Sequence, residues 1–149
     1  MSLTGLVELE ARLGHEFRDP DLLRRALTHP SYAHEHPPEP HNEAFAFLGD
    51  AVLGLVVAEL LAGRAPEDGA GPLTQRRAVL VSAPSLAGWA GRLELPGHLR
   101  LGRGEDQGGG RGKESILATA LEAVLAAVYL DGGLPPARDL ITRLVDGRG

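Results

Sequence analysis

Two carboxylates on one apolar stretch are the residues in this sequence whose types and spacing could do chemistry. Glu43 and Asp50 stand seven residues apart within segment 42–63. Seven residues are about two helical turns, so both side chains would point the same way, about 10 Å apart along the axis. Because an isolated buried charge is costly, such a pair on a mostly apolar helix indicates a site. The position that should bridge them, one turn along, is Ala46.

Two further segments are rich in histidine or glycine. Segment 34–41 holds His34, His36 and His41 among three prolines. These histidines could bind a metal, but a solvated loop is the favoured interpretation, because no helix or strand fixes their spacing. Segment 102–112 has six glycines in eleven residues. It lacks the lysine spacing of a phosphate-binding P-loop, so we expect a mobile loop that leads into the next helix.

Helices must position these residues, because the apolar spacing is helical almost throughout. In segment 42–63 the apolar residues recur at intervals of three and four, with Asn42 as the expected N-cap and Gly63 as the expected C-cap. A second long helix is predicted over 114–129, and Trp89 is expected in the core. No segment alternates like a strand. The pattern predicts an all-α fold with two long central helices and shorter helices around them.

Composition sets limits on the class of protein. The chain has 149 residues, which suits one domain with one core. It has no cysteine, which excludes disulfides and fits a reducing cytoplasm. No apolar run approaches the ~20 residues of a membrane span, and no signal peptide is evident, so we expect a cytoplasmic protein without a membrane segment. The formal charge of −5 weighs against indiscriminate nucleic-acid binding.

Three separated blocks resemble the catalytic domain of the ribonuclease III family. NEAFAFLGDAVL, in the first long helix, is similar to the family's usual NERLEFLGDAVL. The blocks 9–32 and 73–133 resemble the same domain in the same order. The resemblance covers nearly the whole chain, and it implies the all-α fold of that endonuclease domain. Most bacterial members carry a double-stranded-RNA-binding domain after the catalytic domain, whereas the resemblance here already occupies nearly all of the 149 residues. We therefore expect a single domain over 1–149 without a separate RNA-binding domain.

The resemblance also implies an acidic site for Mg²⁺ or Mn²⁺ that cleaves double-stranded RNA. The family pattern is E-x-x-E-x-x-x-D on one helix and D-x-x-E on the other. The matching residues here are Glu43, Ala46 and Asp50, then Thr119 and Glu122. Glu43, Asp50 and Glu122 are the implied catalytic residues, with Asp50 and Glu122 as metal ligands. Two expected acids are replaced, which removes most of the attraction for a divalent cation. We therefore expect cleavage to be absent or severely reduced, with Mg²⁺ or Mn²⁺ as cofactor if the protein is active and no bound metal otherwise.

The resemblance also implies a homodimer, since members of the family pair through the helix that corresponds to segment 42–63. The residue that would insert into the partner is Phe47. Burial of Phe47 in its own core is the alternative. A dimer would offer a groove to duplex RNA, with Arg111 and Lys113 as candidate contacts. The favoured function is therefore a pseudoenzyme that binds RNA or serves as a scaffold, with ribosomal or RNA-processing partners. The alternatives are a minimal active ribonuclease and a protein-interaction dimer without a role in RNA.

Overall fold

The computed structural model describes residues 3–147, and its regular structure there is helical. No strand forms among these residues, where the one β-type pairing is an isolated bridge between Thr28 and Arg100. The prediction of an all-α fold is confirmed. The helices are α1 (Leu3–Leu13), α2 (Pro20–Ala26), α3 (Pro30–Glu35), α4 (Glu43–Arg64), α5 (Ala70–Leu80), α6 (Ala83–Arg92), α7 (Arg103–Gln107), α8 (Glu114–Gly132) and α9 (Leu134–Val145), with the 3-10 turns η1 (Leu95–His98) and η2 (Gly110–Gly112).

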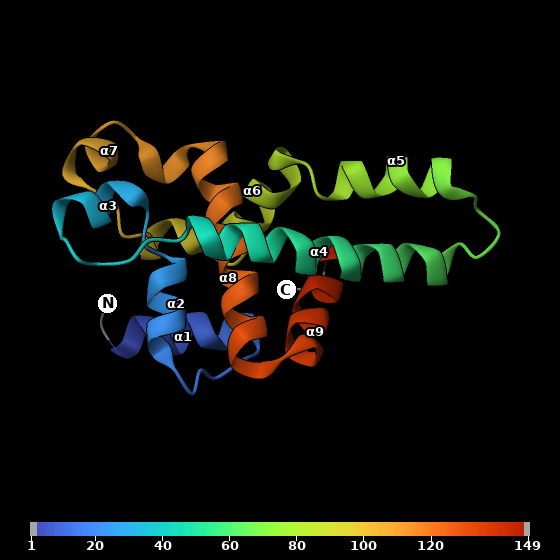
Figure 1. The fold of residues 1–149 in the computed structure, drawn as a ribbon, viewed down its shortest axis with the longest axis horizontal. Helices are drawn as coiled ribbons and strands as arrows, with labels where there is room; N and C mark the ends of the chain where they lie inside the picture. The colour runs from blue at the N-terminus through green and yellow to red at the C-terminus, as the bar shows by residue number, and fades with distance from the viewer. Residues whose placement is uncertain (1–2, 148–149) are drawn as a thin grey trace.

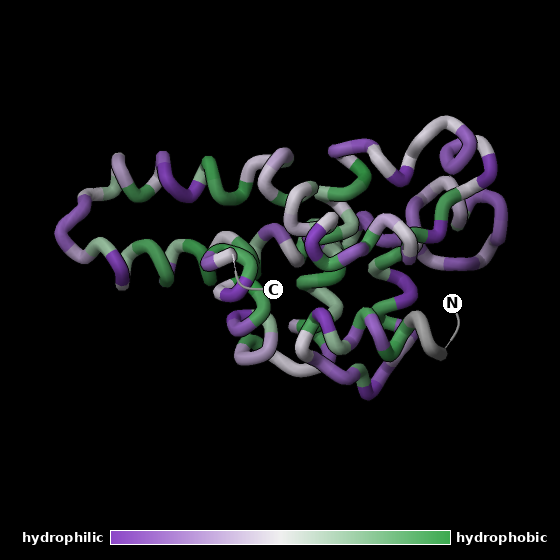
Figure 2. Tube along the Cα trace, turned by 180° about the vertical axis from the view of Figure 1, so that it is seen from behind, coloured by the Kyte–Doolittle hydropathy of each residue, from purple (hydrophilic) through white to green (hydrophobic). Residues whose placement is uncertain are grey.

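Two long helices, α4 and α8, form the centre of the fold and cross each other (Figure 1). Helix α8 is buried on most of its surface from Ile116 to Val128, because α2, α4, α6 and α9 pack around it. Trp89 on α6 joins the same core at 8% exposure, as predicted. The tube in Figure 2 is correspondingly apolar where these helices meet. The predicted arrangement of two long central helices with shorter ones around them is therefore present.

The crossing of α4 and α8 depends on Gly49. A Cβ atom built on Gly49 would stand 1.7 Å from the backbone carbonyl oxygen of Glu122 and 2.5 Å from its carbonyl carbon. The two backbones are therefore closer than any side chain would allow. This approach brings the α4 segment that follows Gly49 directly against the middle of α8.

Helix α5 and the C-terminal half of α4 project from the rest of the molecule as a two-helix arm (Figures 1 and 2). Helix α5 packs against α4 and the start of α6, and none of its residues is buried. A helix of eleven residues without a buried face is not stable by itself in water. The arm therefore presents surface that the described part of the chain does not cover.

Both ends of α4 differ from the prediction. The Asn42 side chain makes no capping bond to the helix; its Nδ2 instead donates to the carbonyl of Ala26 at 3.0 Å, which ties the start of α4 to the end of α2. The C-terminal cap is Ala65 rather than Gly63, because the helix continues through Arg64 without a left-handed residue. Tertiary contact with α2 has taken the place of the local cap.

The two segments expected to be loops are partly helical. Helix α3 extends through His34 to Glu35, and α7 and η2 occupy most of the glycine-rich segment. Two side chains of α3 hold that segment in place: the backbone N–H of Gly102 donates to Ser31 Oγ and that of Arg103 donates to Glu35, both at 2.8 Å. The expectation of a mobile loop was wrong, because these contacts between distant residues are invisible in local composition.

By length and composition alone, α4 and α8 would each suffice to cross a membrane. The core helix of a globular domain passes the same test, and 61% of the α8 window is buried within the molecule. The close crossing at Gly49 also fits two helices that pack against each other in a core. The absence of a membrane segment stays a prediction.

Candidate functional site

Asp50 of α4 and Glu122 of α8 come together where the two helices cross. Asp50 is exposed and Glu122 is half-buried. Burial, followed by a hydrogen bond to Asp50 and the negative charge of Asp50, raises the pKa of Glu122 to about 7. No ion pair with an arginine, lysine or histidine reaches either carboxylate within residues 3–147. The two acids therefore face each other without a compensating cation, and Glu122 is partly protonated near neutral pH.

Ala46 and Thr119 lie one turn before these acids on the same two helices. Ala46 is 9% exposed and belongs to the apolar core, while Thr119 is half-buried. A methyl group offers a cation no ligand, and a hydroxyl offers oxygen without negative charge. The described residues hold no group of three or more histidines, cysteines or acids that could bind a metal ion. Because Mg²⁺ relies on carboxylates for charge, this donor set does not fit a divalent-metal centre of the expected kind.

The uncompensated acid pair should make stability fall as pH rises. The pKa of Glu122 is near its usual 4.5 in the unfolded chain and about 7 in the folded one. The stabilising contribution of the protonated acid is thus complete below pH 4.5 and lost as pH rises through 7. Since Glu122 is partly exposed, the full shift is discounted to about 1–2 kcal/mol. Glu122→Gln should therefore raise the free energy of unfolding in urea at pH 8 and change it little at pH 4.5.

Glu67→Gln is the matched control, because Glu67 is exposed in the loop between α4 and α5. Its unfolding should follow the unaltered protein at both pH values. Equal effects of Glu122→Gln at pH 4.5 and pH 8 would contradict the raised pKa of Glu122.

Glu43 is not brought into the acid pair. It is exposed in the first turn of α4, about two turns from Asp50, and its backbone N–H donates to His41 Nδ1 at 3.3 Å. Its charge acts on His29 at the start of α3, where burial lowers the imidazole pKa and Glu105 and Glu43 oppose that change. A catalytic role for Glu43 stays a prediction.

The two candidate RNA contacts are already bound within the chain. Arg111 donates to Asp106 at 2.8 Å through Nε and to the carbonyls of Pro96 and Leu99 at 2.9 and 2.7 Å through Nη1. These bonds fold the glycine-rich segment back onto η1, which is a structural role. Lys113 Nζ stands 3.2 Å from Glu105 and keeps half of its side chain exposed. RNA contact stays a prediction for both residues, and it would have to compete with these bonds.

Phe47 is 85% exposed, so the alternative of burial in its own core is wrong. It begins an apolar row on the outer face of α4 that continues through Ala51, Leu55, Ala58 and Ala62, at intervals of three and four residues. Leu55 in this row is 52% exposed. We call these five residues the outer row of α4. Two large apolar side chains exposed on one face, Phe47 and Leu55, are typical of a protein contact.

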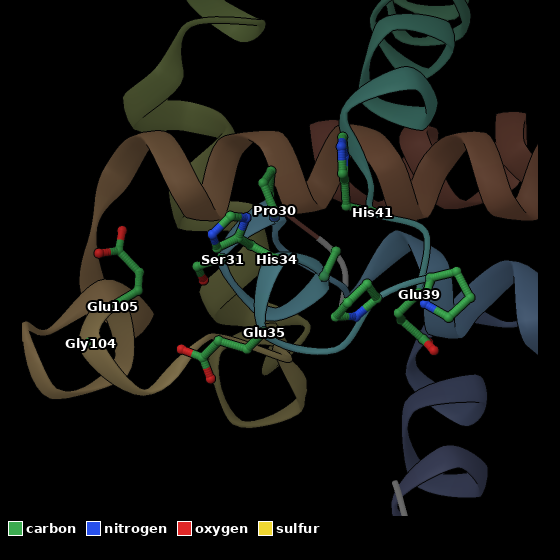
Figure 3. Close-up of a pocket in the computed structure, with 11 residues that line it drawn as sticks. Pro30, Ser31, His34, Glu35, Glu39, His41, Gly104 and Glu105 are labelled. Carbon is green, nitrogen blue, oxygen red and sulfur yellow. The ribbon is translucent and has the colours of Figure 1, made fainter.

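A groove of about 1020 Å³ lies between α3, the loop that follows it and α7 (Figure 3). Local composition did not predict it, because its walls come from segments far apart in the sequence. The histidines expected in a loop are at this groove or next to it and do not converge: His36 stacks on Tyr32 at 4.0 Å, and His41 accepts the bond from Glu43. The groove is lined by Pro30, Ser31, Ala33, His34, Glu35, Pro37, Pro38, Glu39, His41, Gly104 and Glu105.

Comparison with solved structures places this arrangement among known nuclease folds. The chain superposes on the nuclease domain of ribonuclease III from Campylobacter jejuni with a TM-score of 0.89 and 40% identity, over 95% of this chain and 96% of that one. The structure of that domain has been described for flexibility in the region involved in dimer formation. The all-helical fold is therefore that of a ribonuclease III nuclease domain.

Sequence comparison gives the same family. A ribonuclease-III-like profile matches residues 19–146. Ribonuclease 3 of Heliobacterium modesticaldum is 50% identical over 92% of this chain and 59% of its own length, and that of Streptomyces coelicolor is 51% identical over 93% and 50%. The chain belongs to the ribonuclease-III-like family. It spans between half and just under two thirds of the length of such relatives.

Proposed function

We propose that this chain is a cytoplasmic, duplex-RNA-binding or scaffold member of the family in which cleavage is absent or severely reduced. The observation that carries the proposal is the crossing of α4 and α8, where Asp50 and Glu122 face each other without a third acid. Ala46 and Thr119 stand where the family pattern expects acids. The fold that holds the site is intact, so the replacement of the two expected acids affects metal binding and cleavage rather than the shape of the domain.

If the site holds no metal ion, the chain should bind duplex RNA without one. Duplex RNA is recognised mainly through its shape, its phosphates and its 2′-hydroxyls, none of which requires the acid pair. Because the chain carries a net charge of −5, binding should be weak and should fall steeply with salt.

The test is a gel shift with duplex RNA of about 30 base pairs at low salt, in EDTA and separately in Mg²⁺. The proposal predicts similar shifts in both, lost at high salt, with a weaker shift for duplex DNA of the same sequence. If no duplex RNA shifts even at the lowest salt, the chain is a protein-interaction dimer without a role in RNA.

We also propose that the chain forms a homodimer through the outer row of α4. An apolar cavity of about 240 Å³ lies between α4 and α5 in the arm, lined by Ala58, Leu61, Ala62, Ala70, Leu73, Thr74 and Arg77. Cavities of about 150 Å³ can hold benzene, so this one accepts a phenyl side chain. We call it the arm cavity. The exposed ring of Phe47 and the arm cavity are complementary and lie at opposite ends of the same row, as a two-fold symmetric contact requires.

Phe47→Asp should convert the dimer to a monomer, because it removes the ring that would fill the arm cavity and places a charge against the apolar side chains that line most of it. Sedimentation velocity at micromolar concentration is the measurement, and we expect the dissociation constant to rise by about a hundredfold or more. Val7→Asp is the control, since Val7 is 60% exposed on α1, outside the row. Equal association of the two variants would overturn the proposed contact.

A further inference from the structure

Arg77 is an exposed cation in the wall of the arm cavity, and it has no acidic partner in residues 3–147. Its neighbour Arg76 differs, since it pairs with Asp68 of the same arm at 2.9 Å. Arg77 therefore has a guanidinium without an acidic partner, and it lines the cavity that we propose accepts the partner's Phe47.

Asp50 is an acid that lacks a basic partner within the described part of the chain. It is exposed, its neighbour Glu122 is also an acid, and no cation of the described chain pairs with either. Asp50 lies one turn beyond Phe47 on α4. A cation that accompanied Phe47 into the contact would therefore reach the site from the partner.

The register of the outer row places these two groups at the same height. The row runs from Phe47 to Ala62, and its midpoint falls between Gly54 and Leu55. A two-fold axis at that midpoint, perpendicular to two antiparallel α4 helices, sets Phe47 of one protomer opposite Ala62 of its partner. It also sets Asp50 opposite the segment at Ala58 and Glu59, and Ala58 lies beside Arg77 in the wall of the arm cavity.

The same axis places the two groups on the same side of the contact. Asp50 and Leu61 are separated by about three full turns of α4, so they share one flank of the helix. Leu61 lies beneath α5 in the arm cavity, so α5 covers that flank in the C-terminal half. Because the axis reverses the helix direction and keeps the flank, the partner's α5 lies beside Asp50.

We infer that Arg77 of each protomer forms an ion pair with Asp50 of the partner, so that each acidic site is completed by a cation from the other chain. The inference rests on the proposed dimer. The guanidinium gives the acid pair a fixed positive charge at a crossing where Ala46 and Thr119 leave no complete set of ligands for a metal ion.

Charge reversal in separate chains tests this pairing. Arg77→Glu alone and Asp50→Arg alone each place like charges together at both sites of a homodimer. A mixture of the two variants restores attraction at both sites, but only if the pair joins different chains. We expect each homodimer to be weakened by about tenfold or more, and the mixture to form almost exclusively heterodimers, as counted by native mass spectrometry of chains with different tags.

Arg76→Glu mixed with Asp50→Arg is the matched control, because Arg76 is paired within its own arm. This mixture should show no comparable preference for the heterodimer. Circular dichroism checks the fold of every variant, and all the altered side chains are exposed.

The two proposals fail differently. If Phe47→Asp abolishes a dimer of the unaltered chain, while Arg77→Glu and Asp50→Arg assort at random, the dimer stands and the ion pair is overturned. A monomeric unaltered chain overturns both.

Discussion

Replacing Ala46 with glutamate and Thr119 with aspartate in one chain should create Mg²⁺-dependent cleavage of duplex RNA. The two acids would join Asp50 and Glu122 where α4 and α8 cross, which supplies a cation with the oxygen ligands and charge that it now lacks. A divalent metal contributes several kcal/mol to transition-state stabilisation in phosphodiester cleavage. We therefore expect the cleavage rate to rise at least about a hundredfold over the unaltered protein.

The same double variant should be less stable than the unaltered protein in EDTA. Ala46 is 9% exposed, so a glutamate there adds a partly buried charge to two acids that already repel. Mg²⁺ should raise the melting temperature of the double variant and leave that of the unaltered protein almost unchanged. Ala46→Gln with Thr119→Asn, which has similar shapes without the charges, is the control. A folded, dimeric double variant that neither binds metal nor cleaves would contradict the proposal that the two replaced acids account for absent or reduced cleavage.

Gly49→Ala should destabilise the fold more than any other single methyl group added to α4. The new Cβ would stand 1.7 Å from the Glu122 carbonyl oxygen, so the central helices would have to separate or bend. Forced overpacking of this kind costs about 3 kcal/mol or more when backbone is the obstacle. Urea denaturation measures the loss, and the same separation should return the pKa of Glu122 towards its usual value.

Gly63→Ala is the control on the same helix. Nothing lies within 4 Å of a Cβ atom at Gly63, and it falls within the last turns of α4. Alanine is favoured over glycine in a helix, so this variant should gain up to about 1 kcal/mol. If Gly49→Ala unfolds at the same urea concentration as the unaltered protein, the close crossing is wrong.

Helix content was predictable from the sequence because it depends on local spacing. The apolar periods of α4 and α8 and the burial of Trp89 follow from residues within a few turns of each other. The ends of α4 were less predictable: Asn42 prefers a bond to Ala26 over a cap of its own helix. Contacts between distant elements decide such ends.

The site was predictable to a different degree for each residue. That Asp50 and Glu122 share one site followed from the family resemblance, since neither spacing nor periodicity relates two residues on separate helices. The role of Gly49 was missed, because a glycine within a helix looks the same whether its Cβ would meet solvent or backbone. Arg111 was a candidate RNA contact in the sequence, and the structure binds it to Asp106 and two carbonyls. Asp106 lies in the glycine-rich segment, and the two carbonyls lie in or directly after η1, so local composition does not show that these groups meet.

We propose above that the acid pair at the helix crossing does not support efficient cleavage. The most direct measurement is incubation of the purified, unaltered protein with long duplex RNA in Mg²⁺, in Mn²⁺ and in EDTA, with the Ala46→Glu, Thr119→Asp variant alongside. The account predicts intact RNA in all three samples of the unaltered protein and discrete fragments from the variant in Mg²⁺ or Mn²⁺. Discrete, metal-dependent fragments from the unaltered protein would mean that Asp50 and Glu122 suffice, and that this chain is a minimal ribonuclease.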